Sequence, residues 1–74
     1  SMIMYKLTEQ QKEELINKKF CKDSFFYPLK DVDDNWVISE EEVEMAEYKQ
    51  ILWVKDLPEI EYKAKEVILE LKGE

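Results

Sequence analysis

The stretch FFYPLKDVDDNWVISEEE, residues 25–42, decides the predicted fold. Residues 25–30 are rich in aromatic side chains that favour β-strands, and Pro28 within them favours an edge strand because proline cannot donate a ladder hydrogen bond. The Asp and Asn residues of 31–35 tolerate tight turns. Residues 25–30 and Trp36–Ile38 are therefore predicted to form the two arms of a β-hairpin.

Directly after the hairpin, Ser39 and Glu42 form a capping-box pattern that predicts the start of a helix. The helix is expected to cover about residues 40–49, with acidic residues in its first turn where they complement the positive end of the helix dipole. Residues 51–54, ILWV, are β-branched and aromatic, and they predict a further strand that ends at Leu57 and Pro58.

Before the hairpin, residues 3–7 alternate and predict a short strand. Thr8 and Gln11 form another capping-box pattern, which predicts a helix that runs to about Lys19. Its buried stripe at helical spacing is expected to be Leu15, Ile16 and Phe20, with Glu9, Gln10, Lys12 and Glu13 facing water.

The chain from Ile60 onward fits two periodicities. Ala64, Val67, Ile68 and Leu71 fit one face of a helix, whereas Val67, Leu69 and Leu71 fit one face of a strand. A final helix is favoured, with Gly73 where it would stop. The sequence thus predicts a small α+β fold, with a hairpin and an additional strand packed against two or three short helices.

At 74 residues the chain is expected to form one domain, residues 1–74, with Ser1 before Met2 typical of a residue left by tag removal. A core of this size stabilises a fold by only about 3–5 kcal/mol, which favours a homo-oligomer. The net charge is −7 and all the basic residues are lysines, so no binding to duplex nucleic acid is expected.

The chain has one cysteine, Cys21, and no histidine. One cysteine cannot form an intramolecular disulfide, which favours a reducing, cytoplasmic location. The sequence contains no apolar run long enough to span a membrane, and no membrane partner is expected. Cysteine–histidine catalysis and the usual zinc ligand sets are excluded, and no glycine-rich phosphate loop is possible with Gly73 alone. We therefore predict a protein that is not an enzyme and needs no cofactor.

Residues 31–42 also resemble an EF-hand calcium loop. The oxygen-bearing side chains at its first, third, fifth, ninth and twelfth positions are Asp31, Asp33, Asn35, Ser39 and Glu42. The sixth position, normally glycine, is Trp36, and a strand rather than a helix is predicted before the loop. A hairpin turn followed by a helix cap accounts for the same residues and is the favoured interpretation.

Large aromatic side chains are more numerous than a core this small can easily bury. This aromatic set is proposed as a binding surface and consists of Phe25, Phe26, Tyr27, Trp36, Tyr48, Trp53 and Tyr62. Exposed aromatic residues anchor protein interfaces and stack on nucleotide bases. The alternative, slightly favoured for Trp36 and Trp53, is that these two rings form the centre of the core.

The segments FFYP, DVDDNWVISEEEV and WVKDL, within residues 25–57, resemble small uncharacterised proteins of gut bacteriophages and prophages. The resemblance implies a viral or mobile genome as the origin, and the cytoplasm of an infected or lysogenic bacterium as the location. Given that origin, the lack of catalytic groups and the aromatic-rich sequence favour a non-catalytic binding protein that neutralises a host defence protein or sequesters a nucleotide signal. A minor virion or assembly protein is the alternative, and an EF-hand-like calcium-binding module is another.

Overall fold

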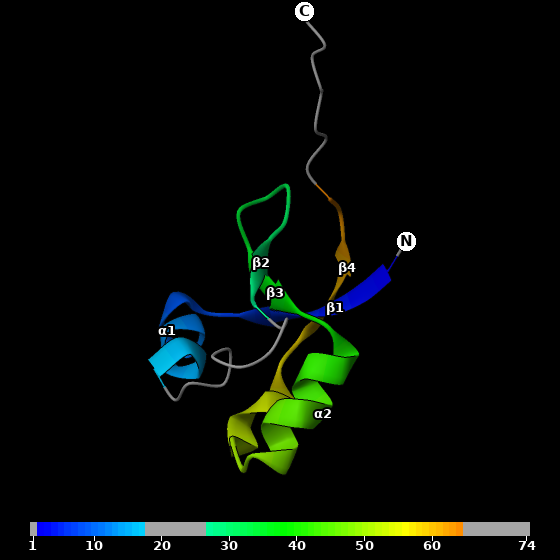
Figure 1. The fold of residues 1–74 in the computed structure, drawn as a ribbon. Helices are drawn as coiled ribbons and strands as arrows, with labels where there is room; N and C mark the ends of the chain where they lie inside the picture. The colour runs from blue at the N-terminus through cyan, green and yellow to red at the C-terminus, as the bar shows by residue number, and fades with distance from the viewer. Residues whose placement is uncertain (1, 18–26, 65–74) are drawn as a thin grey trace, which may run out of the picture.

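The computed structural model describes residues 2–17 and 27–64, which form a four-stranded antiparallel sheet, two α-helices and one 3-10 helix. The elements follow one another as β1 (Met2–Leu7), α1 (Glu9–Asn17), β2 (Leu29–Lys30), β3 (Trp36–Ile38), α2 (Glu40–Tyr48), η1 (Leu52–Asp56) and β4 (Glu59–Tyr62) (Figure 1). The predicted α+β fold class is confirmed. No helix within these two ranges is long and apolar enough to cross a membrane.

The strand order in the sheet is β2-β3-β1-β4. The central strand β1 pairs with β3 through Tyr5↔Ile38 and Leu7↔Trp36, and with β4 from Met2↔Tyr62 to Tyr5↔Glu59. Strand β2 therefore lies at one edge and β4 at the other, which confirms the edge position that proline predicted for the first hairpin arm. The predicted strand at residues 3–7 is also confirmed as β1.

The predicted hairpin is present but its first arm is short, because β2 contains only Leu29 and Lys30. Phe25 and Phe26 lie outside the described residues. The turn closes through a hydrogen bond from the Asp31 amide to the Asn35 carbonyl at 2.9 Å. At the hairpin tip, the Val32 amide donates to the Lys63 carbonyl just beyond β4 at 3.0 Å, so the two edges of the twisted sheet approach each other there (Figure 1).

Helix α1 begins as predicted, with a capping box. The Thr8 amide donates to Gln11 Oε1 at 2.9 Å, and the Gln11 amide donates to Thr8 Oγ1 at 3.0 Å. Leu15 is completely buried and Ile16 packs against the core, in agreement with the predicted stripe. The expected helix end at Lys19 and the third stripe residue, Phe20, lie outside the described residues.

One position in α1 was predicted wrongly: Lys12 does not face water but has an exposed fraction of only 8%. The chain folds β3 against this side of the helix, so the Trp36 ring covers the lysine, with Nζ 4.7 Å from the ring centroid. The ammonium stays at the edge of this contact and binds the carboxylates of Glu9 and Glu13, each at 2.8 Å. Helical spacing alone could not predict that Lys12 is buried, because the ring that covers it belongs to another element, β3.

Helix α2 begins and ends with defined caps. At its start the Glu42 amide donates to Ser39 Oγ and the Ser39 amide donates to Glu42 Oε1, which confirms the second capping box. At its end the Gln50 amide donates to the Glu47 carbonyl and the Ile51 amide to the Ala46 carbonyl, each at 2.9 Å. This pair of bonds is a Schellman motif, and it requires a left-handed residue at Gln50, where φ is 68°.

We expect Gln50→Gly to raise the free energy of unfolding by about 0.5–1 kcal/mol, since glycine removes the left-handed strain of a Cβ but increases the entropy of the unfolded chain. Urea unfolding measures the change. The control is Lys49→Gly at the neighbouring residue, where φ is −85° and glycine should cost about 0.5–1 kcal/mol. Equal effects at both positions would contradict the role given to Gln50.

The strand predicted at residues 51–54 is wrong: Ile51 is the N-cap of the 3-10 helix η1 (Leu52–Asp56), and residues 52–54 lie in this helix. The Schellman motif turns the chain back towards the sheet, and Val54 and Leu57 then donate their amides to the carbonyls three residues before. Ile51, Val54 and Leu57 are all buried. Their spacing of three residues matches the period of a 3-10 helix and places all three on the core side.

The helix favoured from Ile60 onward is wrong for residues 60–62, which lie in strand β4 (Glu59–Tyr62). The alternation of exposed Glu59 and Glu61 with half-buried Ile60 and Tyr62 fits a strand. Residues from 65 onward lie outside the described ranges, so the rest of this expectation has no structural counterpart.

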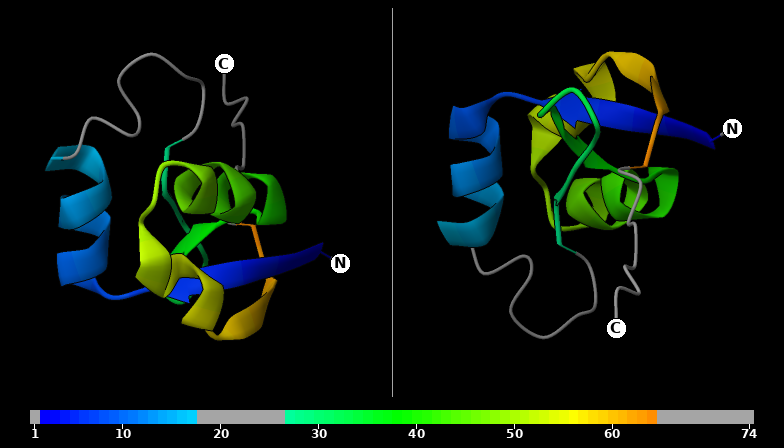
Figure 2. Two further views of the ribbon diagram at one scale, coloured as in Figure 1. Left: turned by 90° about the horizontal axis from the view of Figure 1, so that it is seen from below. Right: turned by 90° about the horizontal axis from the view of Figure 1, so that it is seen from above.

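The core lies between one face of the sheet and the helices. Figure 2 shows α2 and η1 together beside β1, while α1 stands at the end of β1 that is far from the N-terminus. The buried cluster consists of Leu7, Leu15, Ile38, Val43, Ala46, Ile51, Val54 and Leu57. All of the elements except β2 and β4 contribute residues to this cluster. Each of them therefore depends on the others to bury its apolar side chains.

Candidate binding surfaces

The described members of the aromatic set lie on different elements. Trp36 is on β3, Trp53 on η1 and Tyr62 on β4, whereas Tyr48 ends α2 and Tyr27 precedes β2. Tyr48 and Tyr27 are strongly exposed, at 84% and 55%. Phe25 and Phe26 lie outside the described residues.

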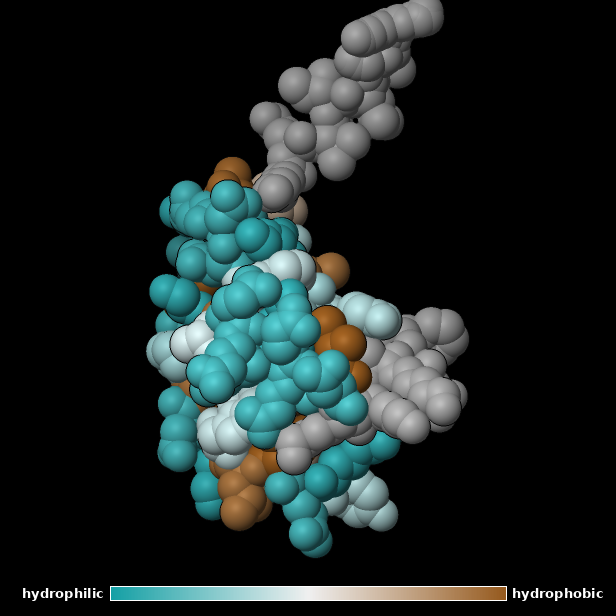
Figure 3. Space-filling model, turned by 90° about the vertical axis from the view of Figure 1, so that its left-hand side faces the viewer, coloured by the Kyte–Doolittle hydropathy of each residue, from teal (hydrophilic) through white to brown (hydrophobic). Residues whose placement is uncertain are grey.

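Both tryptophans are half-buried and pack against the buried cluster, whose centre is formed by aliphatic residues such as Leu15 and Ile38. The expectation that these two rings form the centre of the core is therefore wrong, because they only pack against the outside of the buried cluster. The face of the molecule seen in Figure 3 is mostly hydrophilic, with separate hydrophobic areas.

Asp31, the first residue of the EF-hand-like segment, binds the hairpin turn itself. It is buried, Oδ1 accepts the amides of Asp33 and Asn35 at 2.9 and 2.8 Å, and Oδ2 accepts Asn35 Nδ2 at 3.2 Å. The hydrogen bond from the Asn35 amide is the main cause that holds the pKa of Asp31 below its ordinary value. The carboxylate oxygens are thus already used as acceptors within the loop.

Ser39 and Glu42, the last two residues of the EF-hand-like set, are joined to each other in the capping box of α2. Burial raises the pKa of the Glu42 carboxyl, against the hydrogen bond from the Ser39 amide. The part of the chain that the structure describes holds no group of three or more His, Cys, Asp or Glu residues arranged to bind a metal. Residues 31–42 therefore fold as the turn, strand and helix cap of the favoured interpretation.

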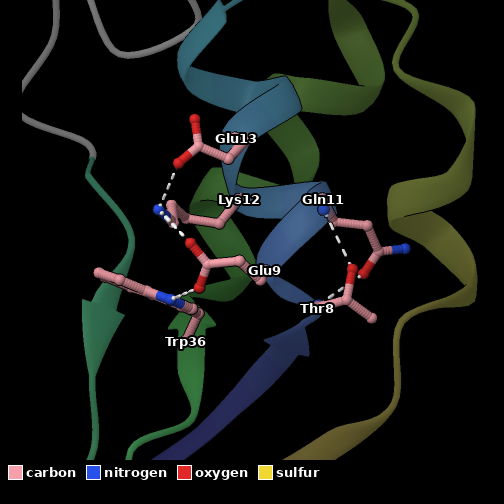
Figure 4. Close-up of polar contacts among 6 residues, drawn as sticks. All are labelled: Thr8, Glu9, Gln11, Lys12, Glu13 and Trp36. Atoms are coloured by element: carbon pink, nitrogen blue, oxygen red, sulfur yellow. Dashed lines mark hydrogen bonds and ion pairs between the residues drawn. The ribbon is translucent and has the colours of Figure 1, made fainter.

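A cluster of charges surrounds Trp36 (Figure 4). Its Nε1 donates to Glu9 Oε1 at 2.9 Å, while the ammonium groups of Lys12 and Lys30 lie 4.7 and 5.0 Å from the ring centroid. These distances suit cation–π attraction. The hydrogen bond with Lys12 and then the one with Trp36 lower the pKa of Glu9, and the bonds to Glu13 and Glu9 raise the pKa of Lys12. The cluster joins α1 to the hairpin, so its first effect is structural.

A second surface, here called the acidic face, joins α2 to β4 across β1. Its carboxylates are Glu40, Glu41 and Glu44 from α2 and Glu59 and Glu61 from β4, and all five side chains are exposed. None of the five has a salt bridge within residues 2–17 and 27–64.

The raised pKa of the Tyr5 phenol shows that carboxylates of both α2 and β4 act on this side chain. Burial is the main cause that raises its pKa, and the negative charges of Glu59, Glu40 and Glu44 raise it further. Glu59 lies opposite Tyr5 in the pairing of β1 with β4. Carboxylates that are far apart in the sequence therefore share one electrostatic environment.

Exposed apolar side chains lie within the acidic face. Met2 and Ile3 of β1 are 57% and 53% exposed, and Ile3 lies opposite Glu61. Together with Ser39, Glu40 and Glu41 they line a shallow groove of about 300 Å³. A groove with apolar side chains and carboxylates beside it can hold an apolar side chain of a partner whose surroundings are basic.

A third feature, here called the Trp53 cleft, is a hollow of about 350 Å³ between the start of α1 and the segment that connects η1 to β4. It is lined by Lys6, Leu7, Thr8, Gln11, Trp53, Asp56, Leu57 and Pro58. The Lys6 amide donates to the Pro58 carbonyl at 2.9 Å, which fixes the two walls relative to each other.

The sequence analysis identified Trp53 as a candidate binding residue, but it identified no other residue of the acidic face or of the Trp53 cleft as one. Met2, Ile3, Glu59 and Glu61 carry no motif, because they become neighbours only through the pairing of β1 with β4. One available signal was the alternation of acidic and larger apolar residues in EIEY, residues 59–62, which is typical of a half-buried strand.

Comparison of the chain with protein-family models, with characterised proteins and with solved structures finds no significant match.

Proposed function

We propose that this protein is a non-catalytic binding protein of viral or mobile-element origin, which uses its acidic face to occupy a basic surface of a host protein. The observation that carries the proposal is the acidic face itself. It places Glu40 and Glu44 of α2 near Glu59 of β4, around Tyr5 and beside exposed Met2 and Ile3. Unpaired carboxylates attract a basic partner over a distance, and the apolar side chains give the contact a buried centre.

The charge of the whole chain supports the same kind of partner. A net charge of −7 raises the rate of encounter with basic proteins and opposes contact with nucleic acid or anionic lipid surfaces. The resemblance to phage and prophage proteins supports action in the cytoplasm of an infected or lysogenic bacterium. Neutralising a host defence protein fits these properties, since blocking a surface needs shape and charge rather than catalytic groups.

The test uses two variants that each remove two negative charges. Glu44→Gln with Glu59→Gln changes the acidic face, whereas Asp33→Asn with Asp56→Asn changes exposed acids elsewhere on the molecule. Each protein is used to capture partners from a lysate of a bacterial host, at low and at high salt, and captured proteins are quantified by mass spectrometry. We expect the wild type and the control to capture a basic protein. The amount of this protein that the acidic-face variant captures should be lower by roughly tenfold or more.

High salt should weaken the same capture, because surface charges are screened within about 8–10 Å at physiological salt. Equal capture by both variants would contradict the proposal. If only the control variant lost capture, the binding surface would lie at the hairpin tip, which contains Asp33, or at the Trp53 cleft, which is lined by Asp56.

Self-association stays a prediction. A homo-oligomer would add apolar burial to a small core, and exposed Tyr48 and Leu52 beside the end of α2 offer apolar area for it. Native mass spectrometry of the purified protein measures the assembly directly.

A further inference from the structure

Strand β4 forms one edge of the sheet, and its pairing with β1 shows which of its backbone groups point outward. The Lys6 amide donates to the Pro58 carbonyl at 2.9 Å, one step before Glu59 in the register. In an antiparallel ladder, directly opposed residues alternate between pairs that exchange hydrogen bonds and pairs that do not. Ile60, two residues after Pro58, therefore bonds to β1, whereas the amides and carbonyls of Glu59 and Glu61 point away from β1.

The outward groups of Glu59 and Glu61 are free to pair with another strand. Both residues are exposed, and their amides and carbonyls have no hydrogen-bond partner in the part of the chain that the structure describes. Just beyond them, the carbonyl of Lys63 accepts the Val32 amide at 3.0 Å, so this side of the chain already pairs with another backbone segment at one position. A sheet edge with free amides and carbonyls is a template for an extended segment of another chain.

The charges beside this edge specify the segment. A residue that pairs directly opposite Glu59 or Glu61 has its side chain on the same face of the sheet as their carboxylates. The carboxylates of α2 lie near that face, since their negative charges raise the pKa of Tyr5 together with the charge of Glu59. Lysine or arginine is therefore favoured at both positions. The residue between them faces the other side, next to half-buried Ile60, where an apolar side chain is favoured.

A second copy of this chain does not suit the edge. Pairing Glu59 and Glu61 of one β4 with the same two residues of a second β4 places each glutamate directly opposite another, and like charges in that position destabilise a sheet. The other edge strand, β2, contains only two residues and follows Pro28, so it offers a shorter template. The occupant that fits the edge of β4 is a basic segment of a different protein.

We propose that the free edge of β4 takes up an extended segment of the partner as an additional antiparallel strand, in which two basic residues flank an apolar one. This inference rests on the proposed function, because it states how the acidic face holds its basic partner. Backbone hydrogen bonds to Glu59 and Glu61 hold the segment, and its basic side chains lie beside their carboxylates. The antiparallel direction is that of the other strand pairs in the described sheet.

The test uses three synthetic eight-residue peptides in which lysine and valine alternate, with both ends capped. The parent peptide has an unmodified backbone. One variant is N-methylated at its lysines, whose amides face Glu59 and Glu61 in the proposed pairing, and the other at its valines, whose amides face away. Isothermal titration calorimetry with the full chain at low salt measures the affinities. We expect lysine methylation to weaken binding about tenfold or more, and valine methylation to change it by less than about threefold.

Amide hydrogen exchange, followed by NMR of the ¹⁵N-labelled protein, locates the contact. In the free protein the Glu61 amide should exchange much faster than the amides of Ile60 and Tyr62, which bond to β1. The parent peptide should slow exchange at Glu59 and Glu61 about tenfold or more. The peptide methylated at its lysines should not slow it.

Two variants at one position separate the backbone contact from the charge. Glu61→Gln removes the carboxylate and keeps the outward amide, whereas Glu61→Pro removes both. Proline is tolerated at an edge position whose amide does not bond within the sheet, so the pairing with β1 should persist. We expect Glu61→Pro to bind the parent peptide several-fold more weakly than Glu61→Gln, and the slow exchange at Ile60 checks that β4 is still in place.

Equal affinity for the three peptides would overturn the strand pairing, since charge alone would then hold the peptide. The acidic face would keep the function proposed above, which the capture experiment tests separately. The strand pairing would also be overturned if valine methylation weakened binding more than lysine methylation, or if the parent peptide did not bind at millimolar concentrations.

Discussion

Replacing Leu15 by alanine is expected to leave much of the protein unfolded at 25 °C. Leu15 is completely buried in the core cluster, to which the sheet and α2 also contribute residues. Replacing a buried leucine by alanine costs about 2.7–5 kcal/mol, because it loses apolar burial and leaves a cavity. A domain of this size has a total stability of only about 3–5 kcal/mol. The measurement is urea unfolding followed by circular dichroism.

The matched control for this change is Leu52→Ala. Leu52 is 63% exposed at the start of η1, so the same chemical change removes little buried area there. We expect its free energy of unfolding to stay within about 0.5 kcal/mol of the wild type. A loss of less than about 1 kcal/mol for Leu15→Ala would show that α1 is not packed on the core as described.

The sequence predicted best what depends on neighbouring residues. Both capping boxes join residues three positions apart, Thr8 with Gln11 and Ser39 with Glu42, so their pattern is visible without any tertiary information. The hairpin was found for the same reason, because its turn closes within residues 31–35.

Segments whose structure depends on distant contacts were predicted less well. The apolar run at residues 51–54 has the composition of a strand, yet the Schellman motif before it and the core beneath it make it a 3-10 helix. The repeat of Ile51, Val54 and Leu57 every third residue was the signal that could have shown this. Strand β4 forms because β1 offers it a free edge, and β1 lies more than 50 residues earlier in the chain.

The candidate sites show the same division. The aromatic set identified Trp36 and Trp53 as residues of interest, but the sequence could not show that the two indole N–H groups differ in their partners. The acidic face needs α2 and β4 to meet across β1 before its carboxylates become neighbours. Net charge alone argued against duplex nucleic acid as a partner, but it could not locate a surface that binds another molecule.

The cluster around Trp36 gives the second large expected effect. Trp36→Ala should lower the free energy of unfolding by about 2–3 kcal/mol, somewhat less than for a fully buried tryptophan, because the ring is half-buried against the core cluster. The change also uncovers Lys12, whose side chain lies under the ring at 4.7 Å. Urea unfolding at pH 7 measures the loss.

Trp36→Phe is the control that separates packing from the hydrogen bond. Phenylalanine keeps a ring near Lys12 and Lys30 but cannot donate to Glu9, so its cost should be smaller than that of alanine. Because its bonds with Lys12 and Trp36 hold the pKa of Glu9 below its ordinary value, their stabilising effect is present above that value and is lost as the pH falls through the lowered pKa.

The difference in stability between the wild type and Trp36→Phe should therefore be largest above the ordinary pKa of a glutamate, about 4.3, and should shrink as the pH falls below it through the lowered pKa of Glu9. The additional loss that alanine causes relative to phenylalanine arises from packing and should not depend on pH in this range. A wild-type to Trp36→Phe difference that stays constant from pH 7 to pH 3 would mean that the ring, and not its bond to Glu9, joins the hairpin to α1.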